Sequence, residues 1–415
     1  MLARRALRLV VCGRLLDPTV GMRGEEACLA LGDGIVEEVR EEPPAGRPLL
    51  DLRGLDNVYI LPGLIDIHVH LRGLSLSYKE DEESGTAAAA RGGITLVADM
   101  PNTVPRLDTI EALSEKLRRL STYSRVEYRV YAAVPPRPED VDKLASMPSV
   151  AGFKIYPSDI ATRWRSIKRL LGLQDMLIVL HPELPEAERT EHENLSVRGA
   201  VRGCHWEQAA AELLASHLDG ARLHVTHASC ASTIHVAKKI GASVDVTPHH
   251  LFYTAPPRGG CLWKVNPPLR EPPEQALLLK HLIEGRIDAV ASDHAPHTAE
   301  EKRMDPLLCP PGIAWLEAWP HILSCLVSAN ALSIEEYLRL TSLGPAEILG
   351  TRRCLGPGCP ASITVMKFNV GRRFAGNKYS KARHTPYFME RLCSETVATI
   401  AAGRVAYLAP GWRIM

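Results

Sequence analysis

Residues 59–70 read YILPGLIDIHVH, an apolar run that ends in two histidines separated by one residue. Seven similar runs follow it: ITLVADMP (94–101), YRVYAAV (128–134), VAGFKIYP (150–157), MLIVLHPE (176–183), RLHVTHAS (222–229), SVDVTPHH (243–250) and DAVASDHAPH (288–297). Stretches with helical character separate the runs, which indicates repeated βα units. Eight units over about 280 residues have the number and size of an α/β fold of the (β/α)8 TIM barrel type. An open doubly wound sheet is the alternative, but it usually has fewer strands, and no GxGxxG turn follows any run.

Both ends of the chain carry short strand patterns instead. They cover residues 7–17, 25–39 and 48–54 at one end and 362–368, 395–403 and 404–408 at the other. We expect the two ends to meet in one small β-sandwich domain, residues 1–56 plus 350–415, beside a barrel domain of residues 57–349. The first 17 residues have arginines inside their apolar stretch and no small-residue cleavage site, so they resemble a strand more than a signal peptide.

The composition excludes several classes of protein. The 415 residues are 46% hydrophobic with a net charge of +1, which argues against disorder and against a nucleic-acid or membrane-surface binder. No apolar run approaches the ~20 residues of a membrane helix, so we expect a cytoplasmic protein. Only three Gln and seven Asn occur, and 36 of the 49 basic residues are Arg, which favours a thermophile; a GC-rich genome is the alternative.

The ten cysteines show no CxxC pair. We expect them to be reduced and mostly buried, with Cys230 a packing residue, although hyperthermophile interiors tolerate disulfides.

Chemically active side chains gather where the predicted strands end. His68 and His70 alternate along the first run, so both imidazoles point to the same side. The fourth, fifth, sixth and eighth runs carry Lys154, His181, His227 and Asp293. Each histidine, or Asp293, alone has an ordinary explanation, as a half-buried histidine or a capping residue. Lys154 is less easily explained in this way, because lysine is almost never fully buried unless it is paired. In a barrel, however, these strand ends converge on one mouth, and imidazole and carboxylate suit a metal such as zinc. Together they predict a metal site.

Several motifs resemble those of dihydroorotases, in the amidohydrolase superfamily. They are PGLIDIHVHLR (62–72), ARGGITLVADMPNT (90–103), GFKIY (152–156), HVTH (224–227), TPHHLF (247–252) and SDHAPH (292–297). The resemblance runs from Pro62 to KARHTPY (381–387). PGLIDIHVH alone would indicate only the superfamily, whereas SDHAPH with MPNT favours dihydroorotase over hydantoinase. One departure is Gly73, which stands where many relatives have an acidic residue.

The resemblance implies a metal centre of two Zn²⁺ ions. GFKIY is typical of the class whose lysine is carbamylated, so carbamylated Lys154 and a hydroxide would bridge the ions. His68, His70 and Asp293 would hold the first ion, and His181 and His227 the second. The implied reaction is the reversible conversion between (S)-dihydroorotate and N-carbamoyl-L-aspartate in de novo pyrimidine (UMP) biosynthesis, with Asp293 as the catalytic proton carrier.

The small-molecule substrate would carry a carboxylate that needs a partner. Arg72 lies two residues beyond His70, and its planar fork suits that group. The family pattern adds Asn102 and His297 to this site. His249 and His250 are expected to be supporting or loop residues.

Two alternatives remain. A hydantoinase or allantoinase would share the barrel and metals without needing a substrate carboxylate at Arg72. A non-enzymatic scaffold protein would typically have lost metal ligands, whereas all six are present here. The resemblance leaves open a homo-oligomer or an association with aspartate transcarbamoylase.

Overall fold

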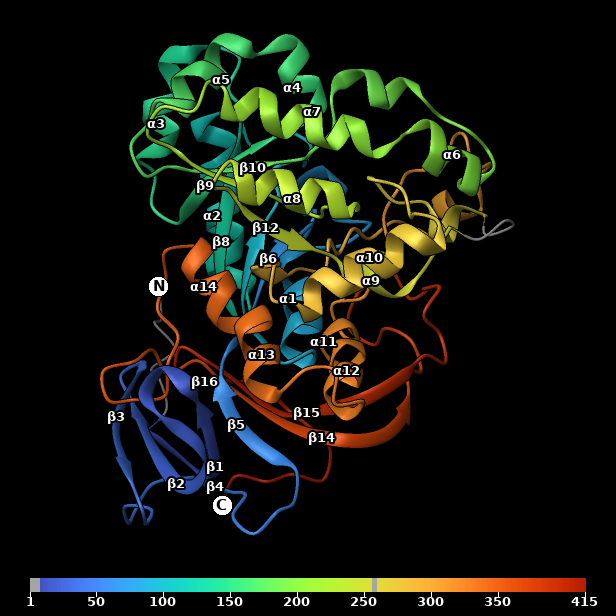
Figure 1. Ribbon diagram of the computed structural model, residues 1–415. Coiled ribbons are helices and arrows are strands. Elements are labelled where there is room, and N and C mark those ends of the chain that lie inside the picture. Colours follow the sequence, from blue (N-terminus) through green and yellow to red (C-terminus); the bar gives the residue numbers. More distant parts are fainter. Residues whose placement is uncertain (1–7, 256–259) are drawn as a thin grey trace.

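The computed structural model describes residues 8–255 and 260–415, and it contains a sheet of parallel strands surrounded by helices, with a second sheet beside it (Figure 1). Eight parallel strands follow one another in chain order in the first of these sheets. They are β6 (Leu64–Val69), β7 (Ile94–Asp99), β8 (Glu127–Ala133), β9 (Val150–Ile155), β10 (Leu177–Leu180), β11 (Arg222–Val225), β12 (Ser243–Val246) and β13 (Ala289–Val290). A parallel bridge between Val69 and His294, just beyond β13, joins the last strand segment to the first. The predicted (β/α)8 barrel is therefore confirmed.

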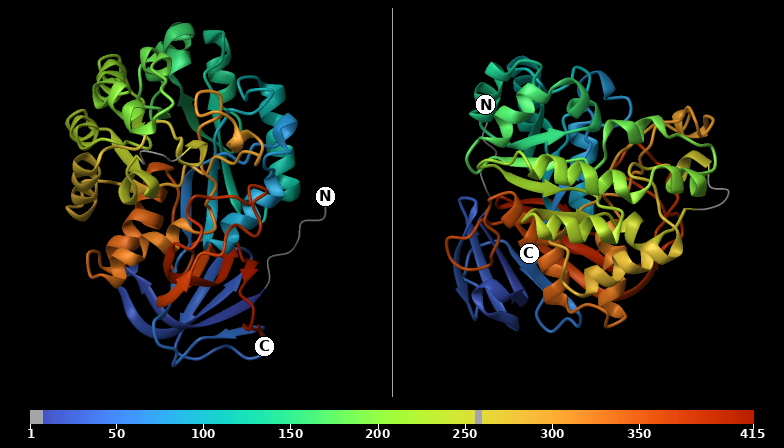
Figure 2. Two further views of the ribbon diagram at one scale, coloured as in Figure 1. Left: turned by 90° about the vertical axis from the view of Figure 1, so that its right-hand side faces the viewer. Right: turned by 45° about the horizontal axis from the view of Figure 1, so that its top comes forward.

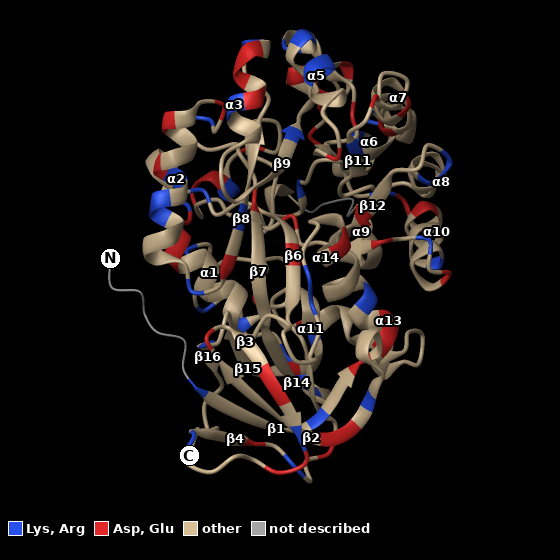
Figure 3. Cartoon of the chain, turned by 90° about the vertical axis from the view of Figure 1, so that its left-hand side faces the viewer, with Lys and Arg blue, Asp and Glu red and all other residues tan. Residues whose placement is uncertain are grey.

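Helices surround this barrel (Figure 2). They are α1 (Glu82–Arg91), α2 (Ile110–Tyr123), α3 (Val141–Ala145), α4 (Pro157–Thr162), α5 (Trp164–Leu171), α6 (Leu195–Val201), α7 (Cys204–Ala215), α8 (Ala231–Lys239), α9 (Pro248–Phe252), α10 (Pro272–Ile283), α11 (Trp319–Leu323), α12 (Cys325–Ser328), α13 (Ile334–Leu338) and α14 (Gly344–Ile348). Acidic and basic residues are interspersed along the outer helices, in line with the net charge of +1 (Figure 3). Over residues 8–255 and 260–415, no helix combines the length and apolarity needed to cross a membrane.

Helix α2 shows how local sequence sets an element. Thr109 caps its start, since the side-chain oxygen accepts a hydrogen bond from the Ala112 amide. Its buried face carries Leu113 and Leu120 at helical spacing, and with them Lys116. A lysine on the buried face of a helix requires polar partners from elsewhere in the fold.

A second sheet combines strands from both ends of the chain, as expected. Its order is β16-β15-β14-β5-β1-β2-β3, with β4 beside β1. The strands are β1 (Leu9–Asp17), β2 (Met22–Gly32), β3 (Ile35–Arg40), β4 (Leu49–Asp51), β5 (Val58–Pro62), β14 (Ile363–Arg373), β15 (Arg391–Ala401) and β16 (Arg404–Leu408). The strand expected near the start is β1, and residues 1–7 of that stretch lie outside the described residues. The domain boundaries at 56/57 and 349/350 stay predictions.

The run at 59–70 forms two strands, not one. Its first part is β5, which pairs antiparallel with β14 in the second sheet, and its second part is β6 of the barrel. Gly63 separates them, and a Cβ at this position would lie 2.8 Å from the Ser362 carbonyl oxygen. Only glycine leaves room for the chain to pass from one sheet to the other here.

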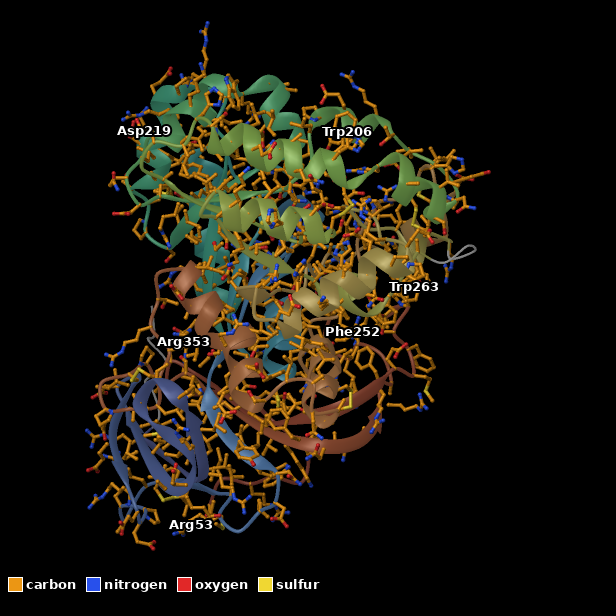
Figure 4. All side chains as sticks on the ribbon, in the orientation of Figure 1. Arg53, Trp206, Asp219, Phe252, Trp263 and Arg353 are labelled. Carbon is orange, nitrogen blue, oxygen red and sulfur yellow. A yellow bond between two sulfur atoms is a disulfide. The ribbon has the colours of Figure 1, made fainter. Side chains whose placement is uncertain are left out.

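All ten cysteines are paired, so the expectation of reduced thiols is wrong. The five disulfides, whose sulfur atoms are yellow in Figure 4, are Cys12–Cys28, Cys204–Cys230, Cys261–Cys309, Cys325–Cys393 and Cys354–Cys359. Four of them join residues 16 to 68 positions apart. The fold brings these partners together: Cys12, for example, lies opposite Cys28 in the β1–β2 register. Cys230, expected only to pack, is bonded to Cys204.

Removing the disulfide with the largest loop should cost the most stability. Cys325–Cys393 ties α12 to β15 across 68 positions, whereas Cys354–Cys359 spans five. Because a longer loop restricts the unfolded chain more, Cys325→Ser with Cys393→Ser should lower the free energy of unfolding by about 2–5 kcal/mol. Thermal unfolding of this variant and of Cys354→Ser with Cys359→Ser makes the comparison. The difference should vanish in reductant, and equal losses without reductant would argue against the loop effect.

Candidate metal centre

Three side chains from the first and last strand segments meet at the carboxyl end of the barrel. His68 on β6 and His70 just after it place their Nε2 atoms 3.2 and 3.0 Å from Asp293 Oδ1. All three side chains are buried, and their ligand atoms lie within 4.8 Å of one another. This spacing allows the three residues to share one metal ion.

A second set lies beside the first. His181 and His227 follow β10 and β11, and their ring centroids are 4.6 Å apart. The His227 ring lies 5.0 Å from that of His68. Lys154 on β9 lines the same cavity of about 200 Å³, together with all five other predicted ligand residues. The structure thus brings the six positions together.

The residues fit a metal centre in their chemistry as well. Lys154 Nζ is buried and has no hydrogen-bond partner among the described residues, and neither has His227 Nδ1. Burial lowers the pKa of Lys154 to about 7 and holds the pKa values of His68 and His227 well below their usual range. These groups are therefore held in or near the neutral form, in which nitrogen has a free lone pair.

Three residues of the site have a strained backbone conformation. Arg72, His227 and Asp293 have φ values of 54°, 41° and 47°, in the left-handed region that non-glycine residues seldom adopt. Such conformations cost free energy and cluster at functional sites, where the surrounding structure enforces them.

A series of side-chain hydrogen bonds orients His68. Thr226 Oγ1 donates to Asp245 Oδ2 at 2.8 Å and accepts from His68 Nδ1 at 2.6 Å. This leaves His68 Nε2 without a proton and facing Asp293. Asp245 Oδ1 also accepts the His227 amide at 2.7 Å. Asp245 was not among the residues predicted from the sequence, although an acidic residue in the middle of the apolar run at 243–250 was a usable signal.

A second series of side-chain hydrogen bonds orients His181. Its Nε2 lies 2.6 Å from Glu183 Oε2, and Arg202 donates to both oxygens of Glu183 at 2.6 and 2.7 Å. Burial alone would raise the pKa of Glu183, but the hydrogen bonds from Arg202 and His181 hold it well below its usual range. Glu183 therefore stays ionised and accepts the Nε2 proton, which leaves Nδ1 of His181 as its free nitrogen.

Glu183→Gln should weaken metal binding by about 10- to 100-fold, because an amide supports the histidine less well than a carboxylate does. Competition against a chelator measures the affinity. Glu191→Gln is the matched control, since Glu191 bonds to Arg198 and Arg202 but not to His181. Equal affinities in the two variants would contradict a role for Glu183 at the metal.

The three residues predicted to bind substrate differ in their position relative to the proposed metal ligands. Arg72 lines the cavity, and its Nη2 is 3.2 Å from His297 Nε2. Asn102 also lines it, with Oδ1 2.6 Å from His70 Nδ1. His297 lines a small neighbouring cavity and reaches the main one through Arg72.

Two other buried histidines and a tyrosine lie close to the site. His250 is buried and contacts Thr247 and the Pro267 carbonyl, and His249 packs 5.7 Å from the Trp315 ring. Tyr156, which was not predicted from the sequence, lines the main cavity. It lies two residues beyond Lys154, so strand alternation could have found it.

The barrel with the second sheet beside it is the fold of solved hydantoinases and dihydropyrimidinases. Among solved structures, the L-hydantoinase (dihydropyrimidinase) of Arthrobacter aurescens superposes with a TM-score of 0.84, at 21% identity over 99% of this chain and 97% of that one. The dihydropyrimidinase of Brevibacillus agri NCHU1002 gives 0.85, at 19% identity over 98% and 96%. At these identities the likeness shows the fold alone.

Sequence relatives are more specific. The profile of the family described as dihydro-orotase-like matches residues 58–168. The dihydroorotase of Aeropyrum pernix is 46% identical over 403 residues, 93% of this chain and 92% of the relative. That of Saccharolobus solfataricus is 39% identical over 84% of each chain, and that of Geobacillus thermodenitrificans 32% over 87% and 89%. The chain belongs to the dihydroorotase family, as its motifs led us to expect.

Proposed function

We propose that the protein is a dihydroorotase, which interconverts (S)-dihydroorotate and N-carbamoyl-L-aspartate in pyrimidine biosynthesis. The observation that carries this proposal is the position of Arg72, whose side chain lines the same cavity as the six metal-ligand positions. Dihydroorotate bears a carboxylate on the ring carbon that one methylene group separates from the reacting carbonyl carbon. Hydantoin and allantoin bear none there, so a buried guanidinium at this place favours dihydroorotate.

The proposed cofactor is a pair of Zn²⁺ ions. His68, His70 and Asp293 would hold one, His181 and His227 the other, and carbamylated Lys154 would bridge them with a hydroxide. The neutral amine of Lys154 can add to carbon dioxide and release a proton, which leaves a carbamate of charge −1. The lowered pKa of Lys154 supports this step, because it makes the neutral amine available near pH 7. When bound, the ions supply a hydroxide nucleophile at neutral pH and polarise the ring carbonyl.

The side chains then have separate tasks. Arg72 binds the substrate carboxylate, with Asn102 beside it and His297 in contact with the guanidinium. Asp293 accepts the nucleophile's proton on a carboxylate oxygen and passes it to the leaving ring nitrogen. In cyclisation the same carboxylate takes the proton from the carbamoyl nitrogen. The side chains of the six proposed ligand residues are all buried, which limits their contact with bulk water.

A ring-opening assay tests the function. The metal-loaded protein should convert dihydroorotate to N-carbamoyl-aspartate at least about 100-fold faster, in kcat/KM, than it opens hydantoin or allantoin. Turnover of hydantoin without dihydroorotate would establish the alternative enzyme. Protein that binds no metal and opens none of the three rings would favour the scaffold alternative.

A further inference from the structure

Lys116 is a buried lysine that the metal centre does not use. Its ammonium donates to the Arg72 carbonyl oxygen at 3.0 Å and to Glu82 Oε1 at 2.9 Å. It also forms an ion pair with Asp99, with Nζ 2.8 Å from Oδ2. The side chains of Lys116, Glu82 and Asp99 are all 0% exposed. An ammonium without solvent contact is therefore directed at the backbone of the residue proposed to bind substrate.

The segment that Lys116 contacts is strained. Arg72, Gly73 and Leu74 have φ values of 54°, 67° and 48°, three left-handed residues in succession. Such a turn persists only where other contacts hold it. Two of these contacts flank Lys116. Asp99 Oδ1 accepts the Leu71 amide at 2.8 Å, and the Glu82 carboxylate occupies the space into which a side chain at position 73 would extend.

The cluster is balanced in charge. Arg119 also pairs with Glu82, at 2.9 Å, so two cations face two carboxylates. Burial alone would raise the pKa of Glu82, but Lys116 and Arg119 hold it below its usual range. The strand β7 and the helices α1 and α2 each supply a member. The turn after His70 is thus held from three directions by one neutral network.

We propose that Lys116 is a positioning residue for substrate recognition, which holds the left-handed turn at Arg72 so that the guanidinium points into the cavity. This inference rests on the proposed function of Arg72. Lys116 acts through Arg72 because its own ammonium is committed to the Arg72 carbonyl, Glu82 and Asp99. An apolar side chain of equal length could fill the space but would leave these three acceptors without their cation.

Lys116→Met tests this idea, since methionine keeps the length and removes the charge. KM for dihydroorotate should rise at least tenfold, with kcat within about threefold and metal content unchanged, because the carboxylate contact is equal in ground and transition states. Arg353→Met is the matched control. Arg353, labelled in Figure 4, is a buried cation paired with Glu127 at the start of β8, the opposite end of the barrel from the cavity. Its removal should leave KM unchanged.

A double-mutant cycle separates positioning from general packing. In an Arg72→Ala background, Lys116→Met should change kcat/KM less than twofold, because its target side chain is gone. A further tenfold loss there, or an unchanged KM in the single variant, would overturn the inference. If Lys116→Met unfolds, Lys116→Met with Glu82→Gln keeps the charge balance and gives the same readout. Wild-type protein that does not turn over dihydroorotate would overturn the proposed function together with this inference, whereas an unchanged KM in an active enzyme overturns the inference alone.

Discussion

Lys154→Ala should lower kcat for dihydroorotate ring opening by at least about 10³-fold and release metal from the centre. Lys154 Nζ is buried among the ligand residues and has no hydrogen-bond partner in the described part of the chain. Truncation removes the group proposed to carry the bridging carbamate. Without it, His68, His181 and His227 would surround two positive ions with too little negative charge.

Added carboxylates should restore part of the activity. Acetate or propionate can enter the space that the lysine leaves and bring back an anionic oxygen ligand. Elemental analysis gives the metal content, and kcat is measured with and without the carboxylate. Lys143→Ala, which removes an exposed lysine of α3, serves as the control and should change neither quantity. Undiminished activity in Lys154→Ala would contradict the bridging carbamate.

Arg72→Ala should raise KM for dihydroorotate on the order of 10²- to 10³-fold and leave the metal content intact. Truncating one member of a buried charge pair costs about 2–5 kcal/mol, and each 1.4 kcal/mol is a factor of ten. Arg72 lines the cavity but is not among the proposed metal ligands, so binding of substrate should suffer and binding of metal should not.

A comparison of substrates with and without a carboxylate shows whether the effect of Arg72→Ala is specific to that group. Any residual turnover of hydantoin, which has no carboxylate at the corresponding position, should be unaffected by the change. Arg118→Ala, an exposed arginine of α2 paired with Glu115, is the control for loss of positive charge. An Arg72→Ala enzyme with wild-type KM would mean that another residue holds the carboxylate.

The barrel and the gathering of the six predicted ligand residues at its mouth were predictable because they depend on local rules. A strand alternates its side chains, so His68 and His70 had to share a side, and parallel strands in a barrel bring their carboxyl ends together. Those two rules place Lys154, His181, His227 and Asp293 at one mouth without knowledge of any packing. The division of the first run at Gly63 was not predicted. The Pro62–Gly63 dipeptide was a usable turn signal, but the close approach of Thr95 and Ser362 to Gly63 could not be foreseen.

Apart from the contact between His181 and Glu183, which are two residues apart, the supporting contacts could not be predicted because they join elements distant in sequence. Arg202 reaches Glu183 from the end of α6, and Thr226 links His68 to Asp245 across three strands. Lys116 even contradicts its local pattern, since it occupies an apolar position of α2. The disulfide pairs could not be predicted for the same reason. Nothing in the sequence pairs Cys325 with Cys393, and only the packing of α12 against β15 brings them together.

The place where the barrel closes suggests a structural role for an ion held by His68, His70 and Asp293. Val69 and His294 form the bridge between the first and last strand segments, and the proposed ligands His70 and Asp293 are the residues directly adjacent to them in the chain. An ion held by His68, His70 and Asp293 would therefore act as a clasp across the seam of the ring. Opening the seam would pull the ligands of that ion apart, and binding the ion would resist the opening. Metal binding and closure of the barrel would therefore be coupled.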